Sequence, residues 1–324
     1  MVQIVDVDLG SRSELREFWL AEREAQMHGR PHAVHRMFED LAMVAEPQPY
    51  YHHLLLAARS GDRLVGTAAL SASLSDNLHL ANIDVNVVPA HRRQGIGTAL
   101  LDAILDWCRE HGRSTVLGEV HVPFGSEPEQ AEAYAFASSH GFATVHIEDH
   151  LLLPLPATPP GDVEIPGYQV VTWMDHCPDE YVAAFCAMRN QMNQDVPKGE
   201  VDMEPIVVDE ERLRTLEGRT ARLFHTIVSA ARAVDESFAG YSRVFLPRGG
   251  TEVIQDDTLV MPGHRGRRLG TALKLATLAV VQRDHPERTA MHTWTAVENL
   301  PMQRTNREFG FTPVEHLHEM QRSI

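Results

Sequence analysis

The 324-residue chain is long enough for two ordinary domains, and its 43% hydrophobic and 23% charged residues are typical of a globular protein. Its formal net charge of −16 argues against a general nucleic-acid or anionic-membrane surface and favours amine-bearing partners. Three cysteines (Cys108, Cys177 and Cys186) are too few for a disulfide framework or a zinc site. No apolar run is long enough to span a membrane and the first residues lack the order of a signal peptide, so we expect a cytoplasmic protein.

Each half of the chain predicts the same order of elements. Helical apolar spacing comes first, and an alternating strand then leads into a glycine-containing turn and a further helix. Hairpin turns are expected at Ser60–Asp62 and Val234–Glu236. The other expected elements are, in chain order, helices Ser13–Glu24 and His32–Val44, strand Asn82–Val87, helix Gly97–His111, and helices Asp179–Asn190 and Asp209–Glu217. This order predicts a mixed α/β (α+β) fold.

The two halves are also related as an internal repeat. At an offset of 173 residues, seven of the twelve positions from Pro89 to Leu100 recur, and the same offset pairs Asp84 with Asp257. A proline-rich stretch between the halves cannot continue a helix or a central strand. We therefore expect an N-terminal copy at 1–156, a linker at 157–166 and a C-terminal copy at 167–324.

The repeated segment predicts an anion site. A strand enters a tight turn and a helix begins there, so the first helical N–H groups have no partner and face an anion favourably. Gly95 and Gly97 would let the backbone approach a phosphate, and Arg92 and Arg93 would add mobile positive charge. Neither a nucleotide P-loop string nor a complete G-x-G-x-x-G dinucleotide string occurs.

The spacing Arg92-x-x-Gly95-x-Gly97 resembles the pyrophosphate-binding motif of the GCN5-related N-acetyltransferase (GNAT) family, in its tandem two-domain type. The resemblance implies two GNAT domains, each with a mixed, mostly antiparallel central sheet and flanking helices. It also implies acetyl-CoA (coenzyme A) as acyl donor and transfer to an amine by direct attack. The implied coenzyme-binding residues of the first copy are Val87, Val88, Arg92, Arg93, Gln94, Gly95, Ile96, Gly97 and Thr98. Those of the second copy are Val260, Met261, Arg265, Gly266, Arg267, Arg268, Leu269, Gly270, Thr271 and Asn299.

The second loop departs from the motif, because Arg268 stands where the first glycine belongs. If that position needs a positive φ, an arginine there is strained; otherwise it adds a cation for the phosphate. Coenzyme binding by the second copy is therefore an open expectation.

The catalytic groups are less well marked. Family members often use as acid a tyrosine four residues before the glycine of a Gly-Phe pair, but those positions here hold Ala137 and Asn306. Tyr134 is a substitute acid or a packed helix aromatic. Asp84 and Asp257 are each a general base or a structural hydrogen-bonding group. Glu298 is a further candidate catalytic residue.

Three histidines, His28, His32 and His35, have helical spacing, but a Gly-Arg-Pro break interrupts them and no metal is expected. The sequence thus favours an N-acyltransferase acting on a small-molecule amine, with no nucleic acid and no membrane partner. A catalytically inactive coenzyme A-binding sensor or scaffold is the alternative, and one catalytic copy beside one structural copy is a third possibility. The acceptor and the oligomeric state stay open.

Overall fold

The structure is a computed structural model that describes residues 2–44, 46 and 48–324. The chain forms two compact units. Unit 1 comprises Met1–Ile147, Gly199–Glu204 and Leu317–Ile324, and unit 2 comprises Glu148–Lys198 and Pro205–His316. Unit 1 thus includes two segments from the C-terminal part of the sequence. The boundaries expected from the sequence, 1–156 and 167–324, stay a prediction about how the copies fold.

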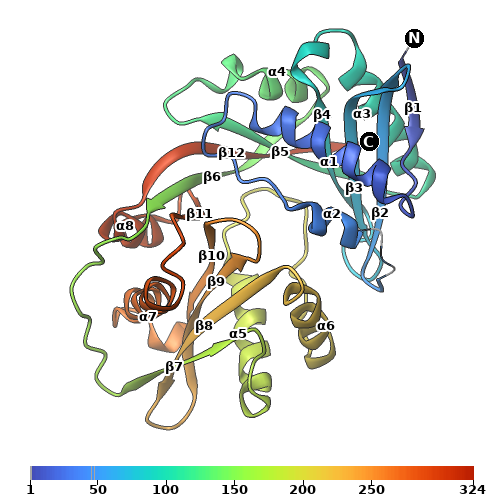
Figure 1. The fold of residues 1–324 in the computed structure, drawn as a ribbon. Helices are drawn as coiled ribbons and strands as arrows, with labels where there is room; N and C mark the ends of the chain where they lie inside the picture. The colour runs from blue at the N-terminus through green and yellow to red at the C-terminus, as the bar shows by residue number, and fades with distance from the viewer. Residues whose placement is uncertain (1, 45, 47) are drawn as a thin grey trace. The chain divides into compact units, whose positions relative to one another are not determined.

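Unit 1 is a sheet covered by helices on both faces (Figure 1). Its strands β1 to β4 are antiparallel neighbours in sequence order, and β5 is parallel to β4. The elements are β1 (Val2–Asp6), α1 (Arg12–Met27), α2 (Phe38–Val44), β2 (Tyr51–Ser60), β3 (Arg63–Ser73), β4 (Leu80–Val87), α3 (Ile96–Glu110), β5 (Thr115–Pro123), α4 (Glu132–Ser139) and the first part of β6 (Ala143–Pro154). The last part of β12 (Thr312–Ser323) follows β5 in the strand order.

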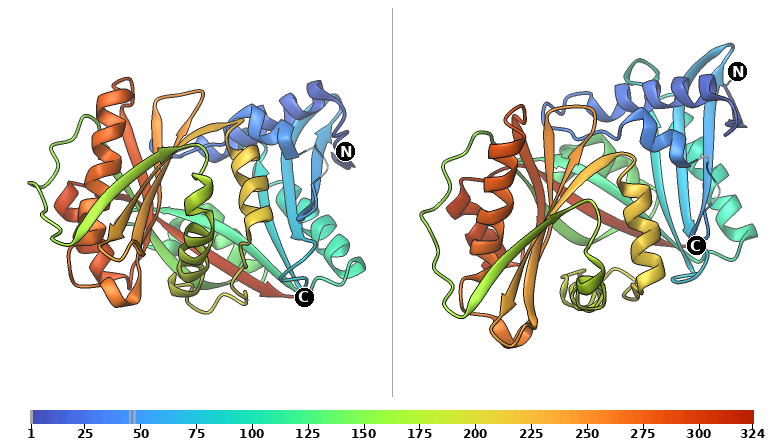
Figure 2. Two further views of the ribbon diagram at one scale, coloured as in Figure 1. Left: turned by 90° about the horizontal axis from the view of Figure 1, so that it is seen from below. Right: turned by 60° about the horizontal axis from the view of Figure 1, so that its bottom comes forward.

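Unit 2 repeats this arrangement, with strand order β6-β11-β10-β9-β8-β7. Among these six strands β10 and β11 are parallel and the other neighbours antiparallel, so the predicted fold class is confirmed. Its elements are β7 (Tyr168–Met174), α5 (Val182–Asp195), α6 (Glu210–Thr220), β8 (Phe224–Ala233), β9 (Phe238–Pro247), β10 (Glu252–Val260), α7 (Leu269–Asp284), β11 (Ala290–Ala296) and α8 (Leu300–Phe309). Figure 2 shows α7 on one face of the sheet and α5 and α6 on the other.

Helix α3 shows why the sequence pattern folds as it does. Ile96, Leu100, Ile104 and Cys108 recur every four residues, and all are buried against the sheet of unit 1. The helix ends just before Gly112, whose φ of 68° is a left-handed conformation that glycine adopts without strain.

The expected helix His32–Val44 is wrong over its first half, because α2 begins only at Phe38. Residues 33–37 are irregular, and their conformation depends on contacts with α1. The Trp19 indole N–H donates to the carbonyl oxygen of Arg36 at 2.8 Å. Asp40 accepts the Met37 N–H at 3.2 Å and so contributes to the start of α2.

No strand or helix occurs between β6 and β7, at residues 155–167, which contain the proline-rich stretch. Throughout the described part of the chain, no helix combines the length and apolar character needed to cross a membrane.

Candidate functional site

In each unit, two parallel strands separate before they end. The pairing of β4 with β5 covers Leu80–Ile83 only, and that of β10 with β11 covers Glu252–Ile254 only. Beyond these points β4 and β10 each continue to a turn and a helix. A V-shaped opening between strands therefore lies beside both repeated loops, and its unpaired backbone groups can bind an extended ligand.

The first loop forms the anion site that the sequence predicts. Arg93 and Gly95 have left-handed φ values of 61° and 79°, and α3 begins at the next residue, Ile96. Among the described residues, no group accepts a hydrogen bond from the main-chain N–H groups of residues 93–98. Those groups and the α3 dipole are available to a phosphate.

The second loop has the same backbone with the two residue types exchanged. Gly266 and Arg268 have φ values of 78° and 59°, and α7 begins at Leu269. The N–H groups of residues 266–271 likewise have no acceptor within the part of the chain that the structure describes. Each loop thus has one arginine and one glycine in the left-handed region, in opposite order. The positive φ of Arg268 means that this arginine is strained, at a cost of about 1 kcal/mol, whereas its action as a cation for the phosphate stays a prediction.

The side chain of the first arginine in each motif forms hydrogen bonds that hold its loop in place. Arg92 donates to the carbonyl oxygens of Val87 and Ala25, both at 3.2 Å, and to Glu132 at 3.0 Å. Arg265 donates to the carbonyl oxygen of its own strand and to Asp195. This arrangement differs from the mobile charge expected for Arg92, and coenzyme contact by either side chain stays a prediction. The exposed side chains of Arg93 and Arg268 are better placed to meet an anion in solvent.

The other predicted loop residues differ in their contacts and in their burial. A Cβ atom on Gly97 would lie 3.2 Å from the Phe136 ring, so that position accepts no larger residue without movement. Arg267 donates to the Tyr168 hydroxyl at 3.0 Å, and Thr98 Oγ1 lies 3.1 Å from His140 Nε2. Val88, Ile96, Leu269 and Thr271 are buried, Val87, Val260, Met261 and Gly270 are partly buried, and Gln94 is exposed.

Asp84 lies on β4 at the point where β4 and β5 separate, and the cation that acts on it is Arg36. Its Oδ2 accepts a hydrogen bond from the Gln26 side chain of α1 at 2.5 Å. Burial and the nearby Glu22 carboxylate raise the pKa of Asp84 above its ordinary value, and hydrogen bonds from Asn86 and Gln26 only partly oppose this. A carboxylate with a raised pKa beside a coenzyme site is suited to accept a proton.

Asp257, at the equivalent position of unit 2, has different neighbours. Arg189 and Arg243 both form ion pairs with it, and the Tyr241 hydroxyl donates to it at 3.0 Å. The adjacent Asp256 shares the same two arginines, whose charge outweighs burial and lowers the pKa of Asp256. Burial and the Asp256 carboxylate raise the pKa of Asp257 itself. The strand β10 is irregular at this point in its pairing with β9. These contacts favour the structural interpretation of Asp257 over the general-base interpretation.

The other candidate catalytic residues have structural contacts. The Tyr134 hydroxyl accepts a hydrogen bond from Thr144 at 3.3 Å, and its ring meets the His318 ring edge to face. Asn299 caps α8 by accepting the Met302 N–H at 3.3 Å. Glu298, next to it, is exposed. Their catalytic and coenzyme-binding roles stay predictions.

The structure adds a buried amine that the sequence analysis did not identify. Lys274 of α7 is 3% exposed and donates to Asn306 Oδ1 at 2.8 Å. Asn306, which stands at the acid position of the motif, in turn donates to Thr295 Oγ1 at 2.9 Å. Burial lowers the pKa of Lys274 to about 7. The repeat could have indicated that Lys274 is buried. At the offset of 173 residues Lys274 corresponds to Leu101, which lies in the core of unit 1.

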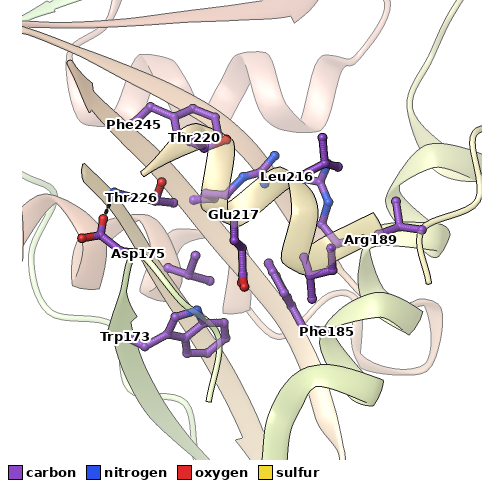
Figure 3. A pocket seen from close by; sticks show the side chains of 13 residues that line it. Trp173, Asp175, Phe185, Arg189, Leu216, Glu217, Thr220, Thr226 and Phe245 are labelled. Atoms are coloured by element: carbon purple, nitrogen blue, oxygen red, sulfur yellow. Dashed lines mark hydrogen bonds between the residues drawn. The ribbon is translucent and has the colours of Figure 1, made fainter. Parts of the chain in front are cut away.

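Unit 2 also has a pocket between the sheet and helices α5 and α6 (Figure 3). Trp173, Phe185 and Phe245 form aromatic parts of its wall. Glu217 enters the pocket from α6 but is paired with Arg214 at 2.7 Å. The charged groups of this pocket are paired within the protein, so it does not select a ligand charge.

The residues described include no group of three or more histidine, cysteine, aspartate or glutamate side chains arranged to hold a metal. One of the three spaced histidines, His35, has its Nε2 atom 3.3 Å from Glu22.

Comparison with known proteins agrees with this geometry. The model of the acetyltransferase (GNAT) family matches residues 13–142. A mycothiol acetyltransferase of Parafrankia sp. (strain EAN1pec) is 29% identical over 127 residues, which are 38% of this chain and 35% of that protein. A solved tandem GNAT protein from the clavulanic acid biosynthesis pathway is 26% identical, with a TM-score of 0.85 over 100% of this chain and 98% of its own. A GCN5-related N-acetyltransferase from Sphaerobacter thermophilus has the same fold, with a TM-score of 0.70 at 14% identity over 99% and 95% of the chains.

Residues 13–142 therefore match the GNAT family, and the chain as a whole carries two copies of the GNAT fold in tandem. The matched family is one of acetyltransferases. The sequence match spans about a third of the length of the mycothiol acetyltransferase, and that relative's substrate is a property of that relative.

Proposed function

We propose that unit 1 transfers an acetyl group from acetyl-CoA to the amine of a small molecule by direct attack. The observation that carries the proposal is the combination, in one unit, of unpaired N–H groups at residues 93–98, the opening between β4 and β5, and Asp84 at that opening. The relative named an acetyltransferase supports acetyl as the acyl group. The net charge of −16 is compatible with a cationic acceptor.

The residues present fit the coenzyme. The loop N–H groups and the exposed Arg93 would hold the pyrophosphate, and the unpaired edge of β4 near Val87 would align the extended arm. Bound acetyl-CoA supplies a thioester whose carbonyl carbon is open to attack by an amine. Asp84, directly or through water, accepts the proton of the ammonium group, so that the amine becomes nucleophilic. Attack on the carbonyl forms the C–N bond and breaks the C–S bond, and the departing coenzyme A thiolate takes up the proton that the attacking nitrogen releases, directly or through water. Holding both reactants beside one another supplies much of the remaining acceleration.

We further propose that unit 2 binds an anion at its loop but does not use Asp257 as a base. Two arginines accompany Asp257, whereas Asp84 has a neutral amide donor and a neighbouring carboxylate. Burial and the adjacent Asp256 carboxylate raise the pKa of Asp257 against the charge of the two arginines, so the difference from Asp84 lies in its contacts. Asp257 Oδ2 is already bound by Arg189, Arg243 and the Tyr241 hydroxyl, which hold it away from a substrate proton.

The proposal is tested by acetyl-CoA turnover across a panel of amines, followed by thiol release. Asp84→Asn should reduce turnover by about 100-fold or more while coenzyme binding is retained, as for other general bases. Asp257→Asn tests the unequal roles and should leave turnover nearly unchanged. Coenzyme binding without turnover on any amine would instead support the alternative, an inactive sensor or scaffold, which the absence of tyrosine at Ala137 and Asn306 favours. A cytoplasmic location stays a prediction from the sequence.

A further inference from the structure

A second buried carboxylate lies close to Asp84. Glu22 of α1 is 1% exposed, and both of its oxygens are bound by the Arg36 guanidinium. Arg36 lies in the irregular segment before α2, and its main-chain carbonyl is held to α1 by Trp19. A glutamate so removed from water keeps its charge only because a cation accompanies it. Burial raises the pKa of Glu22, but hydrogen bonds and charge from His35 and Arg36 outweigh burial and lower it.

Helix geometry brings Glu22 to the same place as Asp84. Gln26 follows Glu22 by four residues, so both side chains lie on one face of α1. Since Gln26 donates to Asp84 at 2.5 Å, that face of the helix is directed at β4. The groups that act on Asp84 are therefore the Glu22 carboxylate, the Arg36 guanidinium and the neutral amides of Gln26 and Asn86.

We propose that Glu22 is a positioning residue whose negative charge, placed by the same face of α1 that holds Asp84 through Gln26, acts on the Asp84 carboxylate, and that Arg36 limits this effect by neutralising Glu22. The inference rests on the proposed role of Asp84 as the base. It assigns a purpose to an otherwise costly buried ion pair, because a base acting near neutral pH is most effective when its pKa is raised toward that pH. The direction of the pKa shift at Asp84 agrees with this arrangement.

The charges predict opposite effects for two substitutions. Glu22→Gln removes the like charge but leaves Arg36 in place, so the pKa of Asp84 should fall by about one unit, a tenfold loss of proton affinity. Arg36→Gln removes the neutralising cation, so the same pKa should rise. Opposite shifts cannot result from a general loss of structure, and either variant alone tests the proposal if the other fails to fold. Glu24→Gln is the matched control, because Glu24 is exposed on the same helix.

The pKa of Asp84 is read in the full chain by carbon NMR of its carboxyl group, which is assigned from its disappearance in Asp84→Asn. The acid limb of kcat/KM against pH should move in parallel, to lower pH in Glu22→Gln and to higher pH in Arg36→Gln. If Glu22→Gln titrates like the wild type and Glu24→Gln, the inference is overturned. If Asp84→Asn remains active, the proposed base is wrong, whereas the NMR titration still decides whether Glu22 acts on Asp84.

Discussion

Replacing the buried Lys274 by methionine should change how the stability of the protein depends on pH. The pKa of Lys274 is lowered by burial from 10.5 to about 7. Since one pKa unit is about 1.4 kcal/mol, this shift of roughly 3.5 units corresponds to a penalty of about 5 kcal/mol for the charged lysine. The Phe309 and Phe311 rings, whose centroids lie 5.9 and 5.3 Å from Nζ, offset about 1–2 kcal/mol of it as cation–π partners.

The sign follows from where the proton is bound. Between pH 7 and 10.5 the unfolded chain holds the Lys274 proton more tightly than the folded chain, so stability rises with pH in that window and the full penalty applies below it. Lys274→Met removes the titration but leaves Asn306 Oδ1 without its donor, a pH-independent cost of about 1–3 kcal/mol. The free energy of unfolding of the wild type, measured against that of Lys274→Met, should therefore increase by about 2 kcal/mol from pH 7 to pH 9.

Urea unfolding at a series of pH values measures this difference, and titrations common to both proteins cancel. Arg283→Met is the control, because it removes an exposed cation from the same helix, α7, and should give no comparable change with pH. Parallel stability curves for the wild type and Lys274→Met would refute the assignment of a depressed pKa to Lys274.

Three further substitutions test the loops and the candidate acid. Gly95→Glu places a negative, β-carbon-bearing residue at a φ of 79°, and calorimetry should show the loss of coenzyme A binding by unit 1 with the fold retained; unchanged affinity would exclude the first loop as the pyrophosphate site. Tyr134→Phe should leave turnover within a few-fold because the hydroxyl has a structural partner in Thr144; a loss of about 100-fold would make it the acid. Arg268→Gly should stabilise the protein by about 1 kcal/mol by relieving a left-handed arginine. In a Gly95→Glu background the same change should weaken coenzyme binding to unit 2 and flatten its salt dependence, whereas tighter binding would mean that Arg268 obstructs the site.

The repeated order of elements could be predicted because it is written in local patterns. Apolar spacing and glycine positions located α3 and both loops to within a few residues. The failure at residues 33–37 has a different cause. That segment is held by contacts of Trp19 and Glu22 with Arg36, residues whose proximity depends on the tertiary fold. No local propensity contains that information.

In the candidate site, too, the sequence predicted the local parts but not the contacts that depend on the tertiary fold. The motif identified the loops, but the bracing role of Arg92 depends on Glu132 and on the carbonyl of Ala25, which lie far from it in sequence. Glu22 and Gln26 gave no signal, because charged and polar residues on a helix are ordinarily solvated. Lys274 could have been found, since a lysine at an apolar helix position contradicts its pattern.

The exchange of glycine and arginine between the two loops shows what the repeat has preserved. A left-handed residue at both positions of each loop is common to the copies, although the residue that adopts it differs. An arginine in that conformation costs about 1 kcal/mol relative to glycine. The two copies therefore share the loop backbone that exposes the N–H groups of residues 93–98 and 266–271, together with one left-handed arginine in each loop. The aspartates near the loops have diverged instead, one beside a carboxylate and one between two arginines. If the proposed roles hold, anion binding and proton transfer are separable in this fold, because both loops keep the anion-binding backbone whereas only Asp84 is assigned as a base.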